Sequence, residues 1–275
     1  MNKRQEHIRN FSIIAHIDHG KSTLADRMIE MTGVLSKREM ESQVLDNMEI
    51  EKERGISVTS SVLQFNYGGY CINILDTPGH QDFSEDTYRT LMAADSAVMV
   101  IDASKGVEAQ TRKLFKVCTM RHIPIFTFIN KMDREANDPF ELLDEIESVL
   151  GISTCPVNWP IGCGKEFKGV YDRNTKDVSL FKAAMNGQKE VETKEIAVDD
   201  EALLAEIGQG YFDKLTEDIE LLDGASAEFD LEQVQAGNLT PVFFGSALTN
   251  FGVETFLKHF LDMTTSPLPR HSSIG

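Results

Sequence analysis

One segment restricts the fold more than any other, because an apolar run, a polar loop and an amphipathic helix pattern follow one another within residues 11–31. The loop, residues 15–22, reads AHIDHGKS and matches the phosphate-binding pattern GxxxxGK[ST], with alanine in place of the first glycine. Such a loop turns successive backbone N–H groups around a phosphate at the positive end of a helix. The alternative is a chance Gly-Lys-Ser turn, but the strand–loop–helix context favours a phosphate site.

Apolar runs alternate with helix-period segments through the rest of the chain. The runs that we interpret as strands are 11–16, 56–65, 70–75, 96–102, 124–130 and 241–247. The helix patterns are 21–31, 81–95, 107–121, 139–150 and 253–263. Continuous apolar strands separated by helices are typical of a parallel sheet that is covered on both faces. The sequence therefore predicts an α/β fold of the P-loop NTPase type, with a mostly parallel sheet and helices on both faces.

The alternation breaks near Pro156, where residues 169–181 have the pattern of an antiparallel hairpin. Residues 186–240 then carry fifteen acidic residues against three lysines, although the whole chain has a net charge of −17. We interpret this part as an α+β insertion before the last strand. The expected organisation is a nucleotide-binding domain from 1–158 and 240–265, an acidic subdomain from 159–239, and a linker from 266–275 to a following domain.

Charge and cysteine usage exclude several classes of protein. A uniformly acidic protein would repel the phosphates of a nucleic acid, but here the acid is segregated, so the remaining surface could approach RNA and composition alone does not decide this contact. We expect no direct DNA binding. No apolar run approaches the roughly 18 residues of a membrane helix, and the polar start MNKRQEHIRN is not a signal peptide. The four cysteines lie far apart without a CxxC pair. We therefore expect a soluble cytoplasmic protein without membrane contact.

A second motif, Asp76-Thr77-Pro78-Gly79-His80, follows the run YCINIL. A carboxylate at Asp76 can hold Mg²⁺ through water, and the N–H of Gly79 can bond a γ-phosphate. His80 would then lie next to the attacking water. A strand-end turn is the alternative for this motif alone, but its place after a phosphate loop favours a nucleotide-dependent switch.

The third motif, Asn130-Lys131-Met132-Asp133, stands at the end of another strand, where ligands bind in open α/β sheets. A carboxylate at Asp133 can accept both N1–H and N2–H₂ of guanine, whereas adenine offers no such pair of donors. Ser246-Ala247, after the final strand, can supply a backbone N–H to guanine O6. Each motif alone is weak. Their order and their places at strand ends together predict a guanine-nucleotide site for GTP and GDP.

The candidate residues fall into two sets. Those assigned to nucleotide binding are Ala15, His16, Ile17, Asp18, His19, Gly20, Lys21, Ser22, Thr23, Asp76, Thr77, Pro78, Gly79, His80, Asn130, Lys131, Met132, Asp133, Ser246, Ala247 and Leu248. Those assigned to catalysis are His80, Lys21 and Gly79. Lys21 would reach the β- and γ-phosphates, and the hydroxyl of Ser22 would bind Mg²⁺.

The motifs AHIDHGKS, RGIS at 54–57, DTPGH, NKMD and GSAL together resemble the GTPase (G) domain of translation factors. Within that class, residues 8–54 resemble LepA, the ribosomal back-translocation factor. From about residue 55 the sequence is similar to the bacterial peptide chain release factor three family. The segments that carry this second resemblance are GISVTSSV, DFSEDTYRTL, NWPIGCGKEFKGVYDR, GASAEFD and TPVFFGSALTNFGV.

The resemblance implies roles that the residues alone do not. Ser57 would join Ser22 and Asp76 around Mg²⁺, and Ile17 and Ile56 would form an apolar gate in front of the catalytic histidine. A K⁺ or Na⁺ ion would lie near Asp18, for which a loop-capping aspartate is the alternative.

The resemblance also implies an activity and partners. They are ribosome-stimulated GTP hydrolysis at termination, with the ribosome and the decoding release factors as partners. The alternatives are LepA-like action during elongation and a G domain that acts only as a nucleotide-dependent binding module.

Overall fold

The structure is a computed structural model of the chain, and it describes residues 5–31, 62–76, 85–181 and 193–267. Several predictions therefore lie outside the described residues. They are the loop at 34–55, the strand start at 56–61, Ile56, Ser57, the motif residues 77–80 and most of the expected linker at 266–275.

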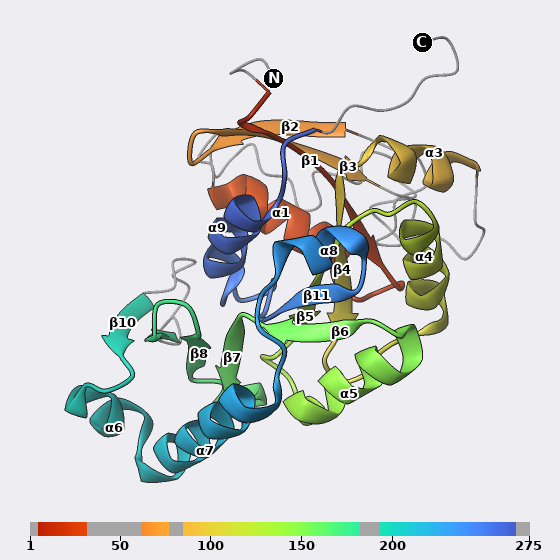
Figure 1. Cartoon of the computed structure of the whole chain (residues 1–275). Coiled ribbons are helices and arrows are strands. Elements are labelled where there is room, and N and C mark those ends of the chain that lie inside the picture. Colours follow the sequence, from red (N-terminus) through yellow and green to blue (C-terminus); the bar gives the residue numbers. More distant parts are fainter. Residues whose placement is uncertain (1–4, 32–61, 77–84, 182–192, 268–275) are drawn as a thin grey trace.

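A seven-stranded sheet forms the middle of the main body, in the order β2-β3-β1-β4-β5-β11-β6 (Figure 1). Its strands are β1 (Ile8–Ala15), β2 (Val62–Tyr67), β3 (Tyr70–Asp76), β4 (Ser96–Asp102), β5 (Ile125–Asn130), β6 (Ser153–Pro156) and β11 (Leu239–Phe244). All neighbouring pairs are parallel except β2 and β3, which form an antiparallel hairpin that turns at Gly68-Gly69. The predicted α/β fold with a mostly parallel sheet is confirmed.

Helices cover both faces of this sheet. They are α1 (Lys21–Met31), α3 (Glu85–Ala93), α4 (Ala109–Met120), α5 (Pro139–Leu150) and α9 (Val253–Met263). Helices α1 and α9 lie side by side and pack on Phe11, Val98 and Phe126 of the sheet (Figure 1). Helices α3, α4 and α5 pack on the other face, which presents Met99 and Ile129.

Strand β4 illustrates why the sequence folds this way. Every residue of Ser96–Asp102 is buried, and the successive apolar side chains at 97–101 enter the hydrophobic clusters on opposite faces of the sheet. Val98 packs in the cluster with α1 and α9, whereas Met99 packs in the cluster with α4 and α5. A strand that is buried on both faces needs an uninterrupted apolar run, which SAVMVID supplies.

One strand of the main sheet is absent from the sequence prediction. Strand β6 is a four-residue edge strand, STCP, which pairs with β11 in parallel register. Strand β11 lies more than eighty residues later in the chain, and a short segment that ends in proline carries no clear strand pattern. The pairing is therefore a tertiary effect that local sequence does not encode.

A second, four-stranded antiparallel sheet in the order β10-β9-β8-β7 lies beside the main body (Figure 1). Its elements are β7 (Asn158–Ile161), the short 3₁₀ turn Gly164–Glu166, β8 (Gly169–Asp172), β9 (Asp177–Phe181), β10 (Thr193–Ala197), α6 (Glu201–Ile207) and α7 (Gln209–Ala225). Strands β8 and β9 are the hairpin expected at 169–181. Helix α8 (Leu231–Ala236) packs back against β11 of the main sheet, although it falls within the acidic segment.

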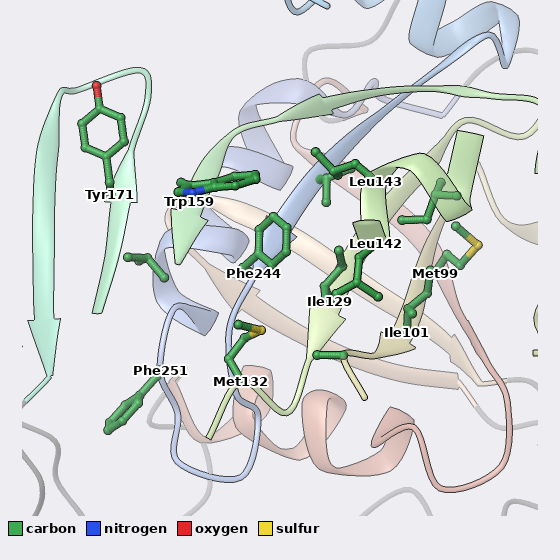
Figure 2. Close-up of a cluster of buried hydrophobic side chains, with 14 of the residues drawn as sticks. Met99, Ile101, Ile129, Met132, Leu142, Leu143, Trp159, Tyr171, Phe244 and Phe251 are labelled. Atoms are coloured by element: carbon green, nitrogen blue, oxygen red, sulfur yellow. The ribbon is translucent and has the colours of Figure 1, made fainter. Parts of the chain in front are cut away.

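Trp159 joins the two sheets. Its side chain is fully buried, and its ring centroid lies 4.6 Å from that of Phe140 and 5.3 Å from that of Phe244. Figure 2 shows Trp159 beside Phe244. The indole Nε1–H donates to Oδ2 of the buried Asp218 on α7 at 2.9 Å. Trp159 is therefore a packing residue at the start of the second sheet.

A largely buried hydrogen bond between a histidine and a carboxylate makes a second connection. Nε2 of His259 on α9 lies 2.5 Å from Oδ2 of Asp172 on β8, and Oδ1 of Asp172 accepts the backbone N–H groups of Asn174 and Thr175. Burial by itself raises the pKa of Asp172, but the hydrogen bond from His259 and the turn amides outweigh it and lower the pKa. The charged form of Asp172 is thus favoured by the folded state.

This lowered pKa predicts a pH-dependent contribution to stability. A carboxylate whose pKa is lower in the folded state stabilises the protein above its unfolded pKa, and the contribution is lost as the pH falls through the folded pKa. We expect Asp172→Asn to lower the free energy of unfolding at pH 7, with a deficit that shrinks as the pH falls below about 5. Urea unfolding of both proteins at several pH values measures the difference.

Asp199→Asn is the matched control, because it makes the same change of charge at an exposed carboxylate. We expect it to alter the free energy of unfolding by less than about 0.5 kcal/mol. A deficit for Asp172→Asn that stays constant from neutral to acidic pH would contradict the assignment.

Candidate functional site

The predicted loops meet at one edge of the main sheet. Strands β1, β4, β5 and β11 are parallel neighbours, so their carboxyl ends lie together. Ala15 at the end of β1 pairs with Val100, and Asn130 at the end of β5 pairs with Asp102. The loops that follow β1, β5 and β11 are those assigned to the phosphate, the base and the base carbonyl, respectively.

The phosphate loop has the backbone that such a loop requires. Two of its residues adopt positive φ angles, Asp18 at 64° and Gly20 at 94°. A Cβ atom on Gly20 would lie 2.3 Å from Nδ2 of Asn130, so this position has no room for a side chain. The two residues with positive φ angles turn the chain sharply just before α1. This backbone geometry orients consecutive N–H groups toward the inside of the loop.

Helix α1 begins at Lys21, directly after the loop. Lys21 and Ser22 are buried at the head of the helix, and Thr23 is half-buried. The first turn of α1 carries no acidic residue that would neutralise the partial positive charge of the helix end. Such a helix start is suited to bind an anion.

The side chain of Asn130 connects three loops. Its Nδ2 donates to the carbonyl of His19 at 2.8 Å, and its Oδ1 accepts the N–H groups of Lys131 and Ala247, each at 2.8 Å. Asn130 is 2 % exposed, so these bonds form away from competing water. The residue therefore fixes the phosphate loop relative to the two loops assigned to the base.

The carboxylate of Asp133 has a fixed orientation. The hydroxyl of Ser246 donates to Oδ1 of Asp133 at 2.5 Å, and the N–H of Thr249 donates to the same hydroxyl at 3.3 Å. Backbone bonds between Ser246 and Phe251 close this loop at 2.8 and 2.9 Å. The serine of the final motif thus positions the carboxylate of the third motif, a role that the sequence prediction did not give it.

The N–H of Ala247 is engaged within the protein, since it donates to Asn130. The loop is also held from α1, where Nε of Arg27 donates to the carbonyl of Ala247 at 3.0 Å and Nη2 donates to that of Leu248 at 3.4 Å. The side chain of Leu248 is 56 % exposed. Arg27 escaped the sequence prediction because a single arginine in a helix has no motif that marks it.

Lys131 connects the end of β4 to the phosphate loop. Its Nζ lies 2.8 Å from Oδ2 of Asp102 and also donates to the backbone carbonyl of Asp18 in the phosphate loop. Burial raises the pKa of Asp102, but the hydrogen bonds from Lys131 and Ser104 outweigh it and lower the pKa. The third residue of this motif behaves differently, since the side chain of Met132 is buried in the core (Figure 2).

The remaining candidates are placed only in part. His19 is fully buried, His16 and Ile17 are half-buried, and Asp18 is exposed. The backbone of Asp76 ends β3 opposite Ile13. Thr77, Pro78, Gly79 and His80, with Ile56 and Ser57, lie outside the described residues.

This geometry agrees with the comparisons to known proteins. The family model described as "Elongation factor Tu GTP binding domain" matches residues 6–266. The chain belongs to this family, and it is therefore a GTPase domain of the class that translation factors use.

Two relatives carry the same printed name, "Peptide chain release factor 3". The protein of Symbiobacterium thermophilum is 55% identical over 269 residues, which is 95% of this chain and 51% of the relative. That of Synechococcus elongatus is 54% identical over 274 residues, which is 97% of this chain and 49% of the relative. The chain thus spans about half the length of these relatives.

A solved structure of a Thermus thermophilus protein, described as "Crystal structure of ttk003000868", shares the fold. It superimposes with a TM-score of 0.74 at 23% identity, over 95% of this chain and 41% of that one. Within the part of the chain that the structure describes, no helix is long and apolar enough to cross a membrane.

Because Asn130 connects three loops, we expect its replacement to lower the free energy of unfolding substantially. Asn130→Ala eliminates three hydrogen bonds and leaves the carbonyl of His19 without its amide donor. Because buried polar groups that lose their partners are costly, we expect the free energy of unfolding to fall by about 2–4 kcal/mol. Urea unfolding measures it. Asn137→Ala, at an exposed position, is the control with an expected change below about 0.5 kcal/mol, and equal effects of the two substitutions would contradict the role.

Proposed function

We propose that this chain binds GTP and GDP at the edge of the main sheet and hydrolyses GTP when the ribosome stimulates it. The observation that carries the proposal is the side-chain amide of Asn130. It joins a loop suited to phosphates to the loops that carry Asp133 and Ser246. A nucleotide has phosphates at one end and a base at the other, so it needs both kinds of loop in one fixed arrangement.

Asp133 selects the base in this proposal. Its carboxylate accepts N1–H and N2–H₂ of guanine, and Ser246 holds it in one orientation. Adenine has no equivalent pair of donors, so it would leave the carboxylate without partners. A site built to hydrogen-bond a ligand discriminates strongly against an analogue that lacks those groups. The N–H of Ala247 already donates to Asn130, so Leu248 of the same loop would meet guanine O6.

The phosphates bind at residues 15–23, where Lys21 contacts the β- and γ-phosphates. Ser22 lies buried at the head of α1, and the backbone of Asp76 ends the strand beside β1. These two residue types carry a hydroxyl and a carboxylate. Oxygen donors of this kind suit Mg²⁺. Ser22 and Ser57, with Asp76 through water, would hold the ion, which supplies positive charge against the phosphate oxygens.

The proposal extends to a monovalent cation. The exposed carboxylate of Asp18 stands in a loop built for anions, where a K⁺ or Na⁺ ion would offset the repulsion. Replacing KCl by a salt of a non-coordinating cation is expected to slow GTP hydrolysis. An unchanged rate would remove the ion and leave Asp18 as a loop-capping residue.

The hydrolytic roles come from the family resemblance. Gly79 would bond the γ-phosphate, and His80 would orient the attacking water behind a gate formed by Ile17 and Ile56. Phosphoryl transfer depends mainly on positioning and on charge stabilisation, so a water-orienting histidine is sufficient.

The step in translation is release-factor recycling at termination, with the ribosome and decoding release factors as partners and the cytoplasm as location. The relatives at 54–55% identity, all named peptide chain release factor 3, match 95–97% of the chain, including the amino-terminal part that resembles LepA. This coverage disfavours the LepA-like alternative.

Base selection is tested by Asp133→Asn. An asparagine amide can donate to the additional oxygen of xanthine, but it cannot accept both guanine donors. We expect GDP affinity to fall about 100-fold or more, whereas affinity for xanthosine diphosphate rises. Calorimetric titration measures both, and Asp199→Asn is the control with the same change of charge. Unchanged GDP affinity in Asp133→Asn would contradict the base assignment.

The hydrolytic assignment is tested by His80→Ala. Loss of an orienting group is expected to reduce ribosome-stimulated hydrolysis by about 100-fold or more, without a change in GDP affinity. Release of inorganic phosphate with and without ribosomes gives the rates, and His7→Ala serves as the control. Full stimulated hydrolysis by His80→Ala, or rapid turnover of the unmodified chain without ribosomes, would oppose the proposal.

A further inference from the structure

We propose that Glu108 is a positioning residue for the phosphate loop, because its carboxylate holds the buried ring of His19 and thereby fixes the loop backbone. The inference rests on the proposed guanine-nucleotide site and deepens it. It assigns phosphate recognition in part to a residue outside every nucleotide-binding motif, on the turn that leads into α4.

The ring of His19 is held at both nitrogens. The backbone N–H of Asp102 lies 3.2 Å from Nδ1, and Oε2 of Glu108 lies 2.6 Å from Nε2. Because a backbone N–H can only donate, Nδ1 accepts this bond, and the ring proton lies on Nε2 and points to the carboxylate. The carbonyl oxygen of Val100 also lies 3.3 Å from Nδ1, but in this tautomer Nδ1 carries no proton that it could donate to that oxygen.

The burial of His19 also favours a neutral ring, which carries a single proton. His19 is fully buried, and desolvation lowers its pKa despite the opposing hydrogen bond to Glu108. The ring is therefore a neutral donor at pH 7 that needs a fixed acceptor. Glu108 is the acceptor that the fold supplies.

The ring of His19 restrains the backbone of the phosphate loop because His19 stands in the middle of the loop's sharp turn. His19 stands between Asp18 and Gly20, the two residues with positive φ angles. Its carbonyl is held by Nδ2 of Asn130, as described above. With the ring and the carbonyl both fixed, the peptide planes on either side of His19 have little freedom, and their N–H groups keep one direction.

Glu108 itself is committed to the loop rather than to its own helix. It is the N-cap residue of α4, yet its side chain makes no capping hydrogen bond. The same Oε2 atom lies 3.6 Å from Nε2 of His16, at the other end of the loop. A carboxylate at this position ordinarily caps the helix, so its direction toward two loop histidines is the feature that needs a function.

The proposal predicts a loss of affinity that is larger for a ligand with a β-phosphate than for a ligand without one. Glu108→Ala removes the acceptor, so the loop N–H groups around the β-phosphate lose their alignment. We expect GDP affinity to fall about tenfold or more, whereas affinity for GMP, which lacks that phosphate, changes less than about twofold. Glu108→Gln retains an oxygen that accepts from Nε2, so it is expected to keep GDP affinity within about threefold of the unmodified chain.

The experiment is competition of GDP and GMP against a fluorescent GDP analogue, with thermal melting of each variant. The matched control is Glu147→Ala, which removes a glutamate that accepts bonds from the N–H and the hydroxyl of Thr154, at 2.8 and 2.7 Å, away from the loop. A role in folding alone lowers the melting temperature but leaves the GDP-to-GMP ratio unchanged. A changed ratio in Glu108→Ala, with rescue in Glu108→Gln and no change in Glu147→Ala, supports the proposal.

A second measurement does not depend on how the variants fold. Nitrogen-15 NMR of the histidine rings in the unmodified chain reports which nitrogen of His19 carries the proton. Protonated Nε2 is the expected result, and protonated Nδ1 overturns the proposal.

The possible outcomes distinguish failure of the proposed nucleotide site from failure of the positioning role of Glu108 alone. If the unmodified chain does not bind GDP, the proposed nucleotide site and this inference both fail. If it binds GDP but the GDP-to-GMP ratio of Glu108→Ala is unchanged, only the positioning role fails.

Discussion

The buried hydrogen bonds of the Asn130 side chain are the interaction on which the candidate site depends. One amide holds the carbonyl of His19 and the N–H of Ala247, which lie 111 and 117 residues away in sequence. In a protein interior such bonds are strong when they are complete and costly when one is missing. The phosphate loop and the base loops consequently adopt their geometry together. Ser246, Lys131 and Glu108 then fix the individual loops within that arrangement.

The sheet explains why these loops can meet at all. Parallel strands place their carboxyl ends at one edge, and the fully buried β4 and β5 form a stiff support between two layers of helices. The second sheet is attached to this support through Trp159 and through the pair of Asp172 with His259.

The sequence predicted the features that local pattern or a motif encodes. The apolar run of β4 and the phosphate loop before Lys21 each follow from residues within a short window. Features that depend on distant partners were missed. Strand β6 exists because β11 pairs with it, and the orientation of Asp133 depends on Ser246, which comes 113 residues later. The sequence prediction gave Glu108 no role, since nothing in its sequence neighbourhood indicates that His19 lies within reach.

Calorimetric titration of the purified chain with GDP and, separately, with ADP, both in the presence of Mg²⁺, measures whether these loops form one pocket for a guanine nucleotide. We expect saturable binding of GDP at one site per chain and no measurable heat with ADP. Binding of both nucleotides with similar affinity would contradict base selection by Asp133. Absence of binding by either would contradict the pocket itself.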